Sequence, residues 1–144
     1  MKASLFLVDT SVWLEVLPAG KSASALRERV DTLLREDRVA TSGMVLLELL
    51  GGSRNDGEYN RLRAMFSALY ALDVDESTWW KASRLAFDVR RKGLTIPFTD
   101  LLIATVAMQH DAAVLHRDRH FDALAHHASL LVESHCHERS NSCG

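Results

Sequence analysis

Cysteine is nearly absent from this chain of 144 residues, because only Cys136 and Cys143 occur, both after Glu133. Cysteines so late in a chain are poor anchors for a disulfide framework, so we expect no disulfide-stapled fold and a reducing compartment. His135 and His137 flank Cys136. The known types of zinc site need a second cluster of ligands as well, and the sequence contains none. We expect this segment to be a frayed terminus.

Long apolar runs are also missing, and so is a strong bias in composition. The apolar stretches are far too short to cross a bilayer. Asp9 interrupts the first of them, residues 5–8, at once, so this stretch cannot be a signal-peptide core. Hydrophobic residues make up 47% and charged residues 25% of the chain, which is typical of an ordinary soluble globular protein. We therefore expect a cytoplasmic protein without a membrane segment.

An excess of positive charge is lacking as well, since the formal net charge is −2. This sum argues against a nucleic-acid partner only at first sight, because setting aside four candidate site carboxylates changes it to +2. Local basic patches can hold a phosphate backbone without a basic pI. On charge alone, an ordinary solvated face is favoured. The arginines and lysines that could form such patches are Arg54, Arg61, Arg63, Lys81, Arg84, Arg90, Arg91, Lys92, Arg117 and Arg119.

The length favours one domain with its own core, which we place at residues 1–132, followed by a poorly ordered polar tail at residues 133–144. Short apolar strands are predicted to alternate with helices, which implies a mainly parallel sheet covered on both faces, a three-layer α/β/α sandwich. The predicted strands are 5–9, 39–41, 70–74 and 113–116. The predicted helices are 11–17, 23–38, a segment from 42 that ends at Gly51-Gly52, 59–69, 76–91, 99–110 (capped by Thr99) and 121–127.

Four acids lie in apolar surroundings: Asp9, Glu48, Asp100 and Asp118. Carboxylates are rarely buried unless they are paired or bound to a metal. Asp9 and Asp118 follow predicted strands, and ligands of open parallel sheets bind at the carboxyl ends of the strands. Asp100 lies at a predicted helix N-terminus, which favours an anion. The arrangement predicts one acidic pocket.

Each acid also has an ordinary alternative role. Asp9 and Asp100 are in positions where aspartate often caps a helix. Glu48, flanked by leucines, has an ion pair with an arginine as its alternative. Either Asp118 or Asp122, four residues later, is a candidate for the fourth acid of the pocket, and the alternative for each is a solvated acid in a loop.

Carboxylates brought close together repel one another, and a divalent cation resolves this repulsion. A ligand set made only of oxygen atoms, with no His or Cys, favours Mg²⁺ or Mn²⁺ over zinc. Such an ion can activate water and stabilise charge on a phosphoryl oxygen. Phosphodiester hydrolysis is therefore the chemistry that suits this pocket best.

Four segments resemble the PIN-domain proteins in order and spacing, and in particular the VapC toxins of bacterial toxin–antitoxin pairs. They are VDTSVW at 8–13, LELLG at 47–51, TDLLIA at 99–104 and HRDRHF at 116–121. The resemblance covers the chain up to about Val132. One departure is His116, where threonine or serine is common in the family, so a hydroxyl contact at this position is in question; a packed strand histidine is favoured over a titrating one.

The resemblance implies an α/β sandwich, Mg²⁺- or Mn²⁺-dependent endoribonuclease activity on tRNA or rRNA, a small VapB-type antitoxin and a homodimer. By motif match it makes Asp9, Glu48, Asp100 and Asp118 the catalytic acids. The three aspartates are expected to hold the metal, and Glu48 to act either as a further ligand or as the base that orients water. The remaining expected contributions are supporting contacts from Thr10, Ser11 and Asp122, and RNA phosphate contacts from Arg117 and Arg119.

Two other functions are compatible with parts of the sequence. A PIN-fold RNA- or protein-binding module without catalysis is the first alternative, although it gives no reason to keep four acids in apolar surroundings. A small metal-dependent phosphatase of another α/β family is the second. That class is expected to have an Asp-x-Asp pattern after the first strand, and Asp9-Thr10-Ser11 lacks the second acid.

Overall fold

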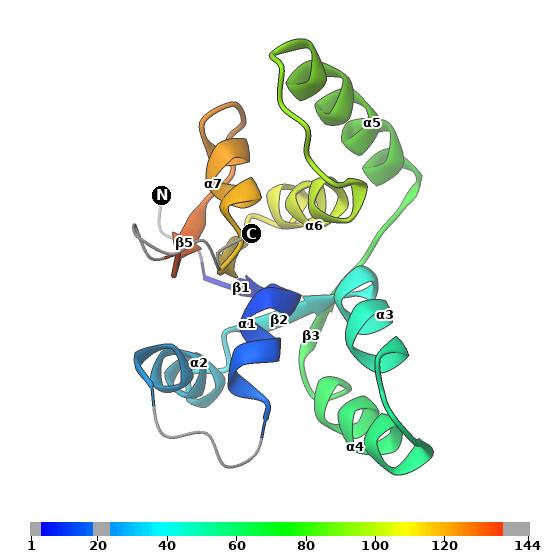
Figure 1. The fold of residues 1–144 in the computed structure, drawn as a ribbon, viewed down its shortest axis with the longest axis vertical. Coiled ribbons are helices and arrows are strands. Elements are labelled where there is room, and N and C mark those ends of the chain that lie inside the picture. The colour runs from blue at the N-terminus through cyan, green and yellow to red at the C-terminus, as the bar shows by residue number, and fades with distance from the viewer. Residues whose placement is uncertain (1–3, 19–23, 137–144) are drawn as a thin grey trace.

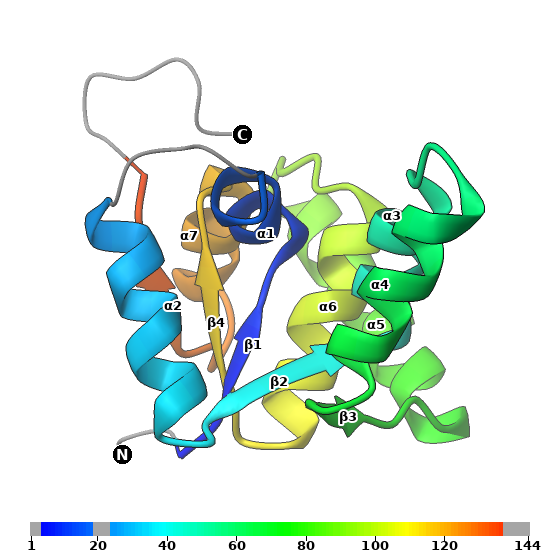
Figure 2. The same ribbon diagram turned by 90° about the horizontal axis from the view of Figure 1, so that it is seen from below.

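The computed structural model of this chain describes residues 4–18 and 24–136. Its sheet has five strands in the order β3-β2-β1-β4-β5, and every neighbouring pair is parallel. Figure 2 shows β1 and β4 side by side, both running toward α1. The strands are β1 (Phe6–Val8), β2 (Val39–Ser42), β3 (Tyr70–Leu72), β4 (Ala113–His116) and β5 (Val132–Ser134).

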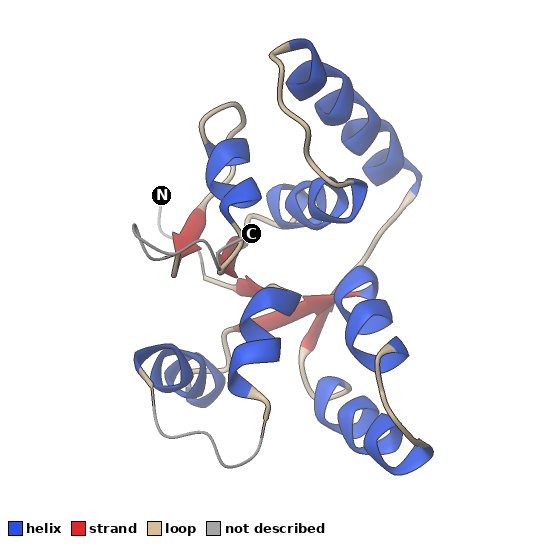
Figure 3. Cartoon of the chain, in the orientation of Figure 1, coloured by secondary structure: helices blue, strands red, loops and turns tan. Residues whose placement is uncertain are grey.

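Helices cover both faces of this sheet, as a three-layer α/β/α sandwich requires (Figures 1 and 3). On one side α6 and α7 pack against β4 and β5, with α5 outside α6; α1, α2 and α4 lie on the other side. The helices are α1 (Thr10–Val16), α2 (Ala25–Arg35), α3 (Gly43–Gly51), α4 (Asp56–Phe66), α5 (Glu76–Arg91), α6 (Phe98–Gln109) and α7 (Arg119–Ala125). The predicted fold class is confirmed.

Two of the helix starts that differ from the sequence-based prediction have a clear local cause. Helix α6 begins at Phe98 with Pro97 at its N-cap, so Thr99 lies in the first turn and does not cap the helix. Proline suits the start of a helix because its fixed φ is compatible with helical geometry and it has no N–H to leave unpaired. Helix α4 begins at Asp56 because the side chain of Asn55 accepts a hydrogen bond from the Glu58 amide, 2.9 Å away.

The sheet continues past the predicted end of the domain at residue 132. Strand β5 pairs Leu115 with Glu133 and His116 with Ser134. Arg29 on α2 forms a bidentate pair with Glu133, at 2.9 Å between Nη2 and Oε1. The first residues of the predicted tail therefore belong to the fold, and a three-residue strand gave too short a pattern to be found. Cys136 is disulfide-bonded, although no disulfide framework was expected; the rest of the tail lies outside the described residues.

The core lies on both sides of the central strands. Leu7 and Val8 of β1 and Val114 and Leu115 of β4 have no exposed side-chain surface. Helix α6 is buried along residues 100–107, which agrees with its nearly continuous apolar sequence. No helix in the described part of the chain is long and apolar enough to span a membrane.

Candidate functional site

The candidate site lies where the strand order reverses. The chain passes from β1 to β2 on one side of β1, whereas β4 pairs on the other side. In a parallel sheet this switch point opens a crevice beyond the carboxyl ends of the two strands. Asp9 directly follows β1, Asp118 follows β4 by two residues, and the amide of Asp9 donates to the Leu115 carbonyl at 2.9 Å. The fold therefore brings the two aspartates to the same edge.

Asp9 is held by Ser11, which also joins two loops of the site. Asp9 is 4% exposed and is the N-cap of α1. Its Oδ2 accepts from the Ser11 hydroxyl at 2.6 Å and from the Ser11 amide at 3.0 Å. The same hydroxyl accepts from the Arg117 amide at 3.0 Å, so one serine fixes Asp9 relative to the loop that carries Asp118.

Glu48 reaches the site from α3 and differs from its expected surroundings. It is exposed, and the neighbouring Leu47 is 66% exposed, so the flanking leucines do not bury it. The hydroxyl of Thr10 donates to its Oε1 at 3.0 Å. Each of the two hydroxyls predicted to support the site therefore orients one acid. The Ser11 hydroxyl contacts Asp9, and the Thr10 hydroxyl contacts Glu48.

Asp100 and Asp118 meet around the side chain of His120. Asp100 is 8% exposed in the first turn of α6, and Asp118 is the N-cap of α7. The Nδ1 atom of His120 lies 2.9 Å from Asp118 Oδ1 and 3.2 Å from Asp100 Oδ2. Ligand atoms of these three residues all lie within 4.8 Å of one another. Asp9 and Glu48 are not part of this closest group among the residues described.

The four acids nevertheless share one electrostatic field. Burial raises the pKa of Asp100 to about 8, and the charge of Asp118, followed by those of Asp9 and Glu48, adds to the effect. Burial also raises the pKa of Asp9 against the hydrogen bonds of Ser11. The pKa of Glu48 is raised by partial desolvation, opposed by its Thr10 hydrogen bond and reinforced by Asp9 and Asp118.

These residues fit a divalent cation. Close carboxylates that raise one another's pKa values lack a positive partner, which a cation supplies. In addition, His120 Nδ1 is inaccessible to solvent and makes no hydrogen bond, although two carboxylates lie beside it. Asp100, Asp118 and Asp9 offer the hard oxygen ligands that Mg²⁺ and Mn²⁺ prefer.

His116 and Asp122 form a separate layer behind Asp118. His116 is fully buried, and its Nδ1 accepts from the Asp118 amide at 3.1 Å. The neutral ring then carries its proton on Nε2, which lies 3.2 Å from Asp122 Oδ1. Asp122 also accepts from the Ser134 hydroxyl at 2.9 Å. Burial lowers the pKa of His116 despite the surrounding acids, which agrees with the expected packed histidine. Asp118, and not Asp122, lies beside Asp100.

The two arginines predicted to contact RNA differ in their surroundings. The guanidinium of Arg117 is paired with Glu15, at 3.1 Å between Nη1 and Oε2, and its side chain is 19% exposed. Arg119 is exposed at the first position of α7. Arg119 is therefore the more accessible of the two cations beside the acids.

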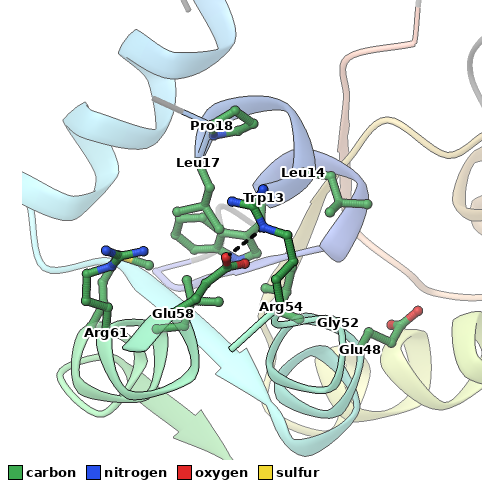
Figure 4. Close-up of a pocket in the computed structure, with 12 residues that line it drawn as sticks. Trp13, Leu14, Leu17, Pro18, Glu48, Gly52, Arg54, Glu58 and Arg61 are labelled. Carbon is green, nitrogen blue, oxygen red and sulfur yellow. Dashed lines mark hydrogen bonds and ion pairs between the residues drawn. The ribbon is translucent and has the colours of Figure 1, made fainter. Parts of the chain in front are cut away.

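A cavity of about 730 Å³ adjoins the acidic site between α1, α3 and α4. Figure 4 shows Trp13 and Leu17 against it, the Arg54–Glu58 ion pair, and Glu48 at the end opposite Arg61. Its lining residues are Trp13, Leu14, Leu17, Pro18, Glu48, Leu49, Gly52, Arg54, Glu58, Arg61, Leu62 and Met65. The cavity therefore combines an apolar wall with arginines and ends at one of the site acids.

Sequence reasoning missed His120, because it considered only carboxylates as ligands. The available signal was the spacing of His120 two residues after Asp118. An aspartate N-cap accepts a hydrogen bond from the second helical residue, and here the His120 amide donates to Asp118 Oδ1 at 2.9 Å. That bond holds the histidine next to the acid that caps its helix.

Comparison with known proteins identifies the fold and its relatives. The PIN domain family model matches residues 6–127. Ribonuclease VapC11 of Mycobacterium tuberculosis strain H37Rv is 33% identical over 134 residues, which cover 90% of this chain and 98% of the relative. Ribonuclease VapC51 of the same strain is 35% identical over 127 residues, covering 83% and 85% of the two chains.

Solved structures agree with this assignment at the level of the fold. The VapBC2 complex of Rickettsia felis, bound to a promoter DNA fragment, matches with a TM-score of 0.74 and 22% identity, over 90% of this chain and 98% of its own. VapBC-1 of nontypeable Haemophilus influenzae also has a TM-score of 0.74, with 21% identity and coverage of 90% and 97%. The chain belongs to the PIN domain family and, within it, to the VapC ribonucleases.

Proposed function

We propose that this chain is a Mg²⁺- or Mn²⁺-dependent endoribonuclease that acts as the toxin of a VapBC-type pair. The observation that carries the proposal is the convergence of Asp9, Glu48, Asp100 and Asp118. Burial raises the pKa of Asp100 to about 8, and the charges of the other three acids add to that effect. Side chains arranged only for stability have no reason to repel one another in this way, whereas a cation-binding site needs concentrated negative charge.

Each acid has a role that its contacts support. Asp100, Asp118 and Asp9 would hold the cation, and a bound divalent cation supplies charge stabilisation at a phosphoryl oxygen. Glu48 is accessible, and Thr10 occupies its Oε1, which leaves Oε2 to orient an attacking water and accept its proton. Ser11 fixes the position of Asp9, and the raised pKa of Glu48 moves this carboxylate toward the range in which a general base is effective.

RNA is the proposed substrate, with tRNA or rRNA as its class. The sequence relatives carry the name ribonuclease, and one structural neighbour, VapC20 of Mycobacterium tuberculosis, is described as a sarcin-ricin loop cleaving toxin, with a TM-score of 0.55. The exposed cation of Arg119 at the start of α7 is suitably placed to contact a phosphate next to the acids.

A VapB-type antitoxin is the proposed protein partner. Several neighbours were solved as VapBC complexes. The cavity beside Glu48 has apolar walls formed by Trp13, Leu14 and Leu17, which suits an amphipathic segment of a partner chain. Charge reversal at Arg61, on its rim, is expected to weaken this complex without changing RNA cleavage.

A second copy of this chain is the other proposed partner. Aromatic side chains are exposed on α5 and at the start of α6: Trp79 is 57%, Trp80 71% and Phe98 73% exposed. An exposed apolar surface of this kind is typical of an interface. Light scattering on the wild type and on Trp80→Glu tests the assignment, with a dimer expected only for the wild type.

Cleavage of defined RNA tests the proposed activity. Purified wild-type protein should cut a tRNA mixture or an rRNA fragment with Mn²⁺ and stop when EDTA is added. Asp100→Asn and Asp118→Asn should lose at least a hundredfold in rate, whereas Asp31→Asn, on the exposed face of α2, should retain full activity. If both site variants bound RNA normally and arrested growth like the wild type, the alternative of a non-catalytic binding module would be correct.

A further inference from the structure

We propose that His120 is a direct nitrogen ligand of the divalent cation, which makes this centre a mixed Asp/His site that prefers Mn²⁺ to Mg²⁺. The inference rests on the proposed function for the existence of the metal site. It changes the chemistry of that site, because the expected preference for hard ions assumed a ligand set without histidine. Two contacts and one unsatisfied atom support it.

The distances match those between neighbouring ligands of one ion. In an octahedral site with bonds of about 2.1 Å, adjacent ligand atoms lie about 3 Å apart. His120 Nδ1 lies 2.9 Å from Asp118 Oδ1 and 3.2 Å from Asp100 Oδ2. One ion is therefore able to bind all three atoms with little movement of the side chains.

The ring nitrogen has no other partner. His120 Nδ1 is buried from solvent, yet its geometry makes no hydrogen bond with either of the carboxylates. A buried polar atom without a hydrogen bond is costly and rare in folded proteins. Coordination of an ion between the two carboxylates satisfies this nitrogen and both acids at once.

Local structure holds the imidazole in this place before an ion arrives. His120 is the second residue of α7, and its amide donates to Asp118 Oδ1 at 2.9 Å. The Asp118 amide donates in turn to the buried His116. The backbone on both sides of Asp118 is thus fixed, so the histidine and the aspartate are presented together.

A nitrogen ligand alters which ion the site prefers. Mg²⁺ strongly favours oxygen ligands, whereas Mn²⁺, at the weak end of the first-row transition series, accepts an imidazole nitrogen more readily than Mg²⁺ does. Replacing His120 should therefore reduce Mn²⁺ affinity by about tenfold or more while changing Mg²⁺ affinity much less, as expected for the loss of one ligand. The measurable quantity is the ratio of the two dissociation constants.

Pulsed electron paramagnetic resonance of the Mn²⁺-loaded protein tests the inference without any activity assay. Wild-type protein should show the ¹⁴N modulation of a directly bound imidazole, and His120→Asn should lose it. His126→Asn is the matched control, since His126 is exposed at the C-cap of the same helix.

The outcomes separate this inference from the proposed function. Mn²⁺ that binds to the wild type and is lost in Asp100→Asn, but shows no ¹⁴N modulation, would overturn the role of His120 and leave the oxygen-liganded site intact. Modulation that persists in His120→Asn would likewise overturn it. No Mn²⁺ binding to the wild type in calorimetry would overturn the metal site itself.

Discussion

Replacement of Asp100 by asparagine is expected to stabilise the metal-free protein at neutral pH. Burial, followed by the charge of Asp118, raises the pKa of the Asp100 carboxyl from 3.8 to about 8. Between these two values the folded protein retains a proton that the unfolded chain releases. The free energy of unfolding therefore falls as the pH rises through this window. Asparagine cannot ionise, so the variant avoids this loss.

The size of the effect follows from the width of the window. One pKa unit corresponds to about 1.4 kcal/mol, so the roughly three units between pH 4 and pH 7 set a ceiling of about 4 kcal/mol. Asp118 carries part of the repulsion, and asparagine alters the contact with His120 at 3.2 Å. We expect a net gain of about 1–2 kcal/mol, which corresponds to a rise in Tm of several degrees.

Urea unfolding in EDTA at pH 7.5 and pH 4.5 measures this effect. The free energy of unfolding of Asp100→Asn should exceed that of the wild type at pH 7.5. At pH 4.5, where the carboxyl of the folded wild type is protonated, the two values should be nearly equal. Asp31→Asn, at an exposed position, should change little at either pH. Added Mn²⁺ should stabilise only the wild type. A variant that is less stable than the wild type at pH 7.5, or that gains equally at both pH values, would refute the reasoning.

Three further outcomes are expected. His116→Leu removes the acceptor for the Asp118 amide and should weaken Mn²⁺ binding about tenfold by calorimetry. In His116→Asn the side chain is able to accept the same amide in an Asx turn, so this variant should lose less Mn²⁺ affinity. Ser11→Ala removes the hydroxyl hydrogen bond that lowers the pKa of Asp9. The acid limb of a Mn²⁺-binding curve should therefore move to higher pH, whereas Ser11→Thr should leave the curve where it is. Arg29→Met should lower the free energy of unfolding by about 1 kcal/mol at pH 7. Desolvation alone would raise the pKa of Glu133, but the hydrogen bonds and charges of Arg29 and His135 together lower it. The difference between Arg29→Met and the wild type should therefore shrink in denaturant titrations as the pH falls below the ordinary pKa of a glutamate.

The alternating pattern was sufficient to predict most of the fold, because apolar strands and amphipathic helices leave strong periodic signals. Strand β4 (Ala113–His116) and helix α5 (Glu76–Arg91) have the predicted bounds. Strand β5 (Val132–Ser134) was missed because its three residues are only partly buried and so show no apolar run. Its place is fixed by pairing with β4 and by the ion pair between Arg29 and Glu133, which are distant in sequence.

The site was predictable where it depends on strand ends and unpredictable where it depends on side-chain direction. Asp9 and Asp118 were placed correctly at one edge by the rule for parallel sheets. The exposure of Glu48 was not predictable, since flanking leucines are equally compatible with an outward-facing position on α3. The contact of His120 with two acids depends on the rotation of α7 relative to α6, which a single sequence does not specify.

The position of the acids explains why the fold tolerates them and why it still needs a cation. Asp9 and Asp118 cap α1 and α7, and Asp100 lies in the first turn of α6. Three helix N-termini therefore face the same edge of the sheet, and their partial positive charges reduce the repulsion between the carboxylates. This compensation is incomplete, since the pKa of Asp100 remains raised to about 8. The protein thus carries a carboxylate pocket that helix caps hold in place and that only a further positive charge completes.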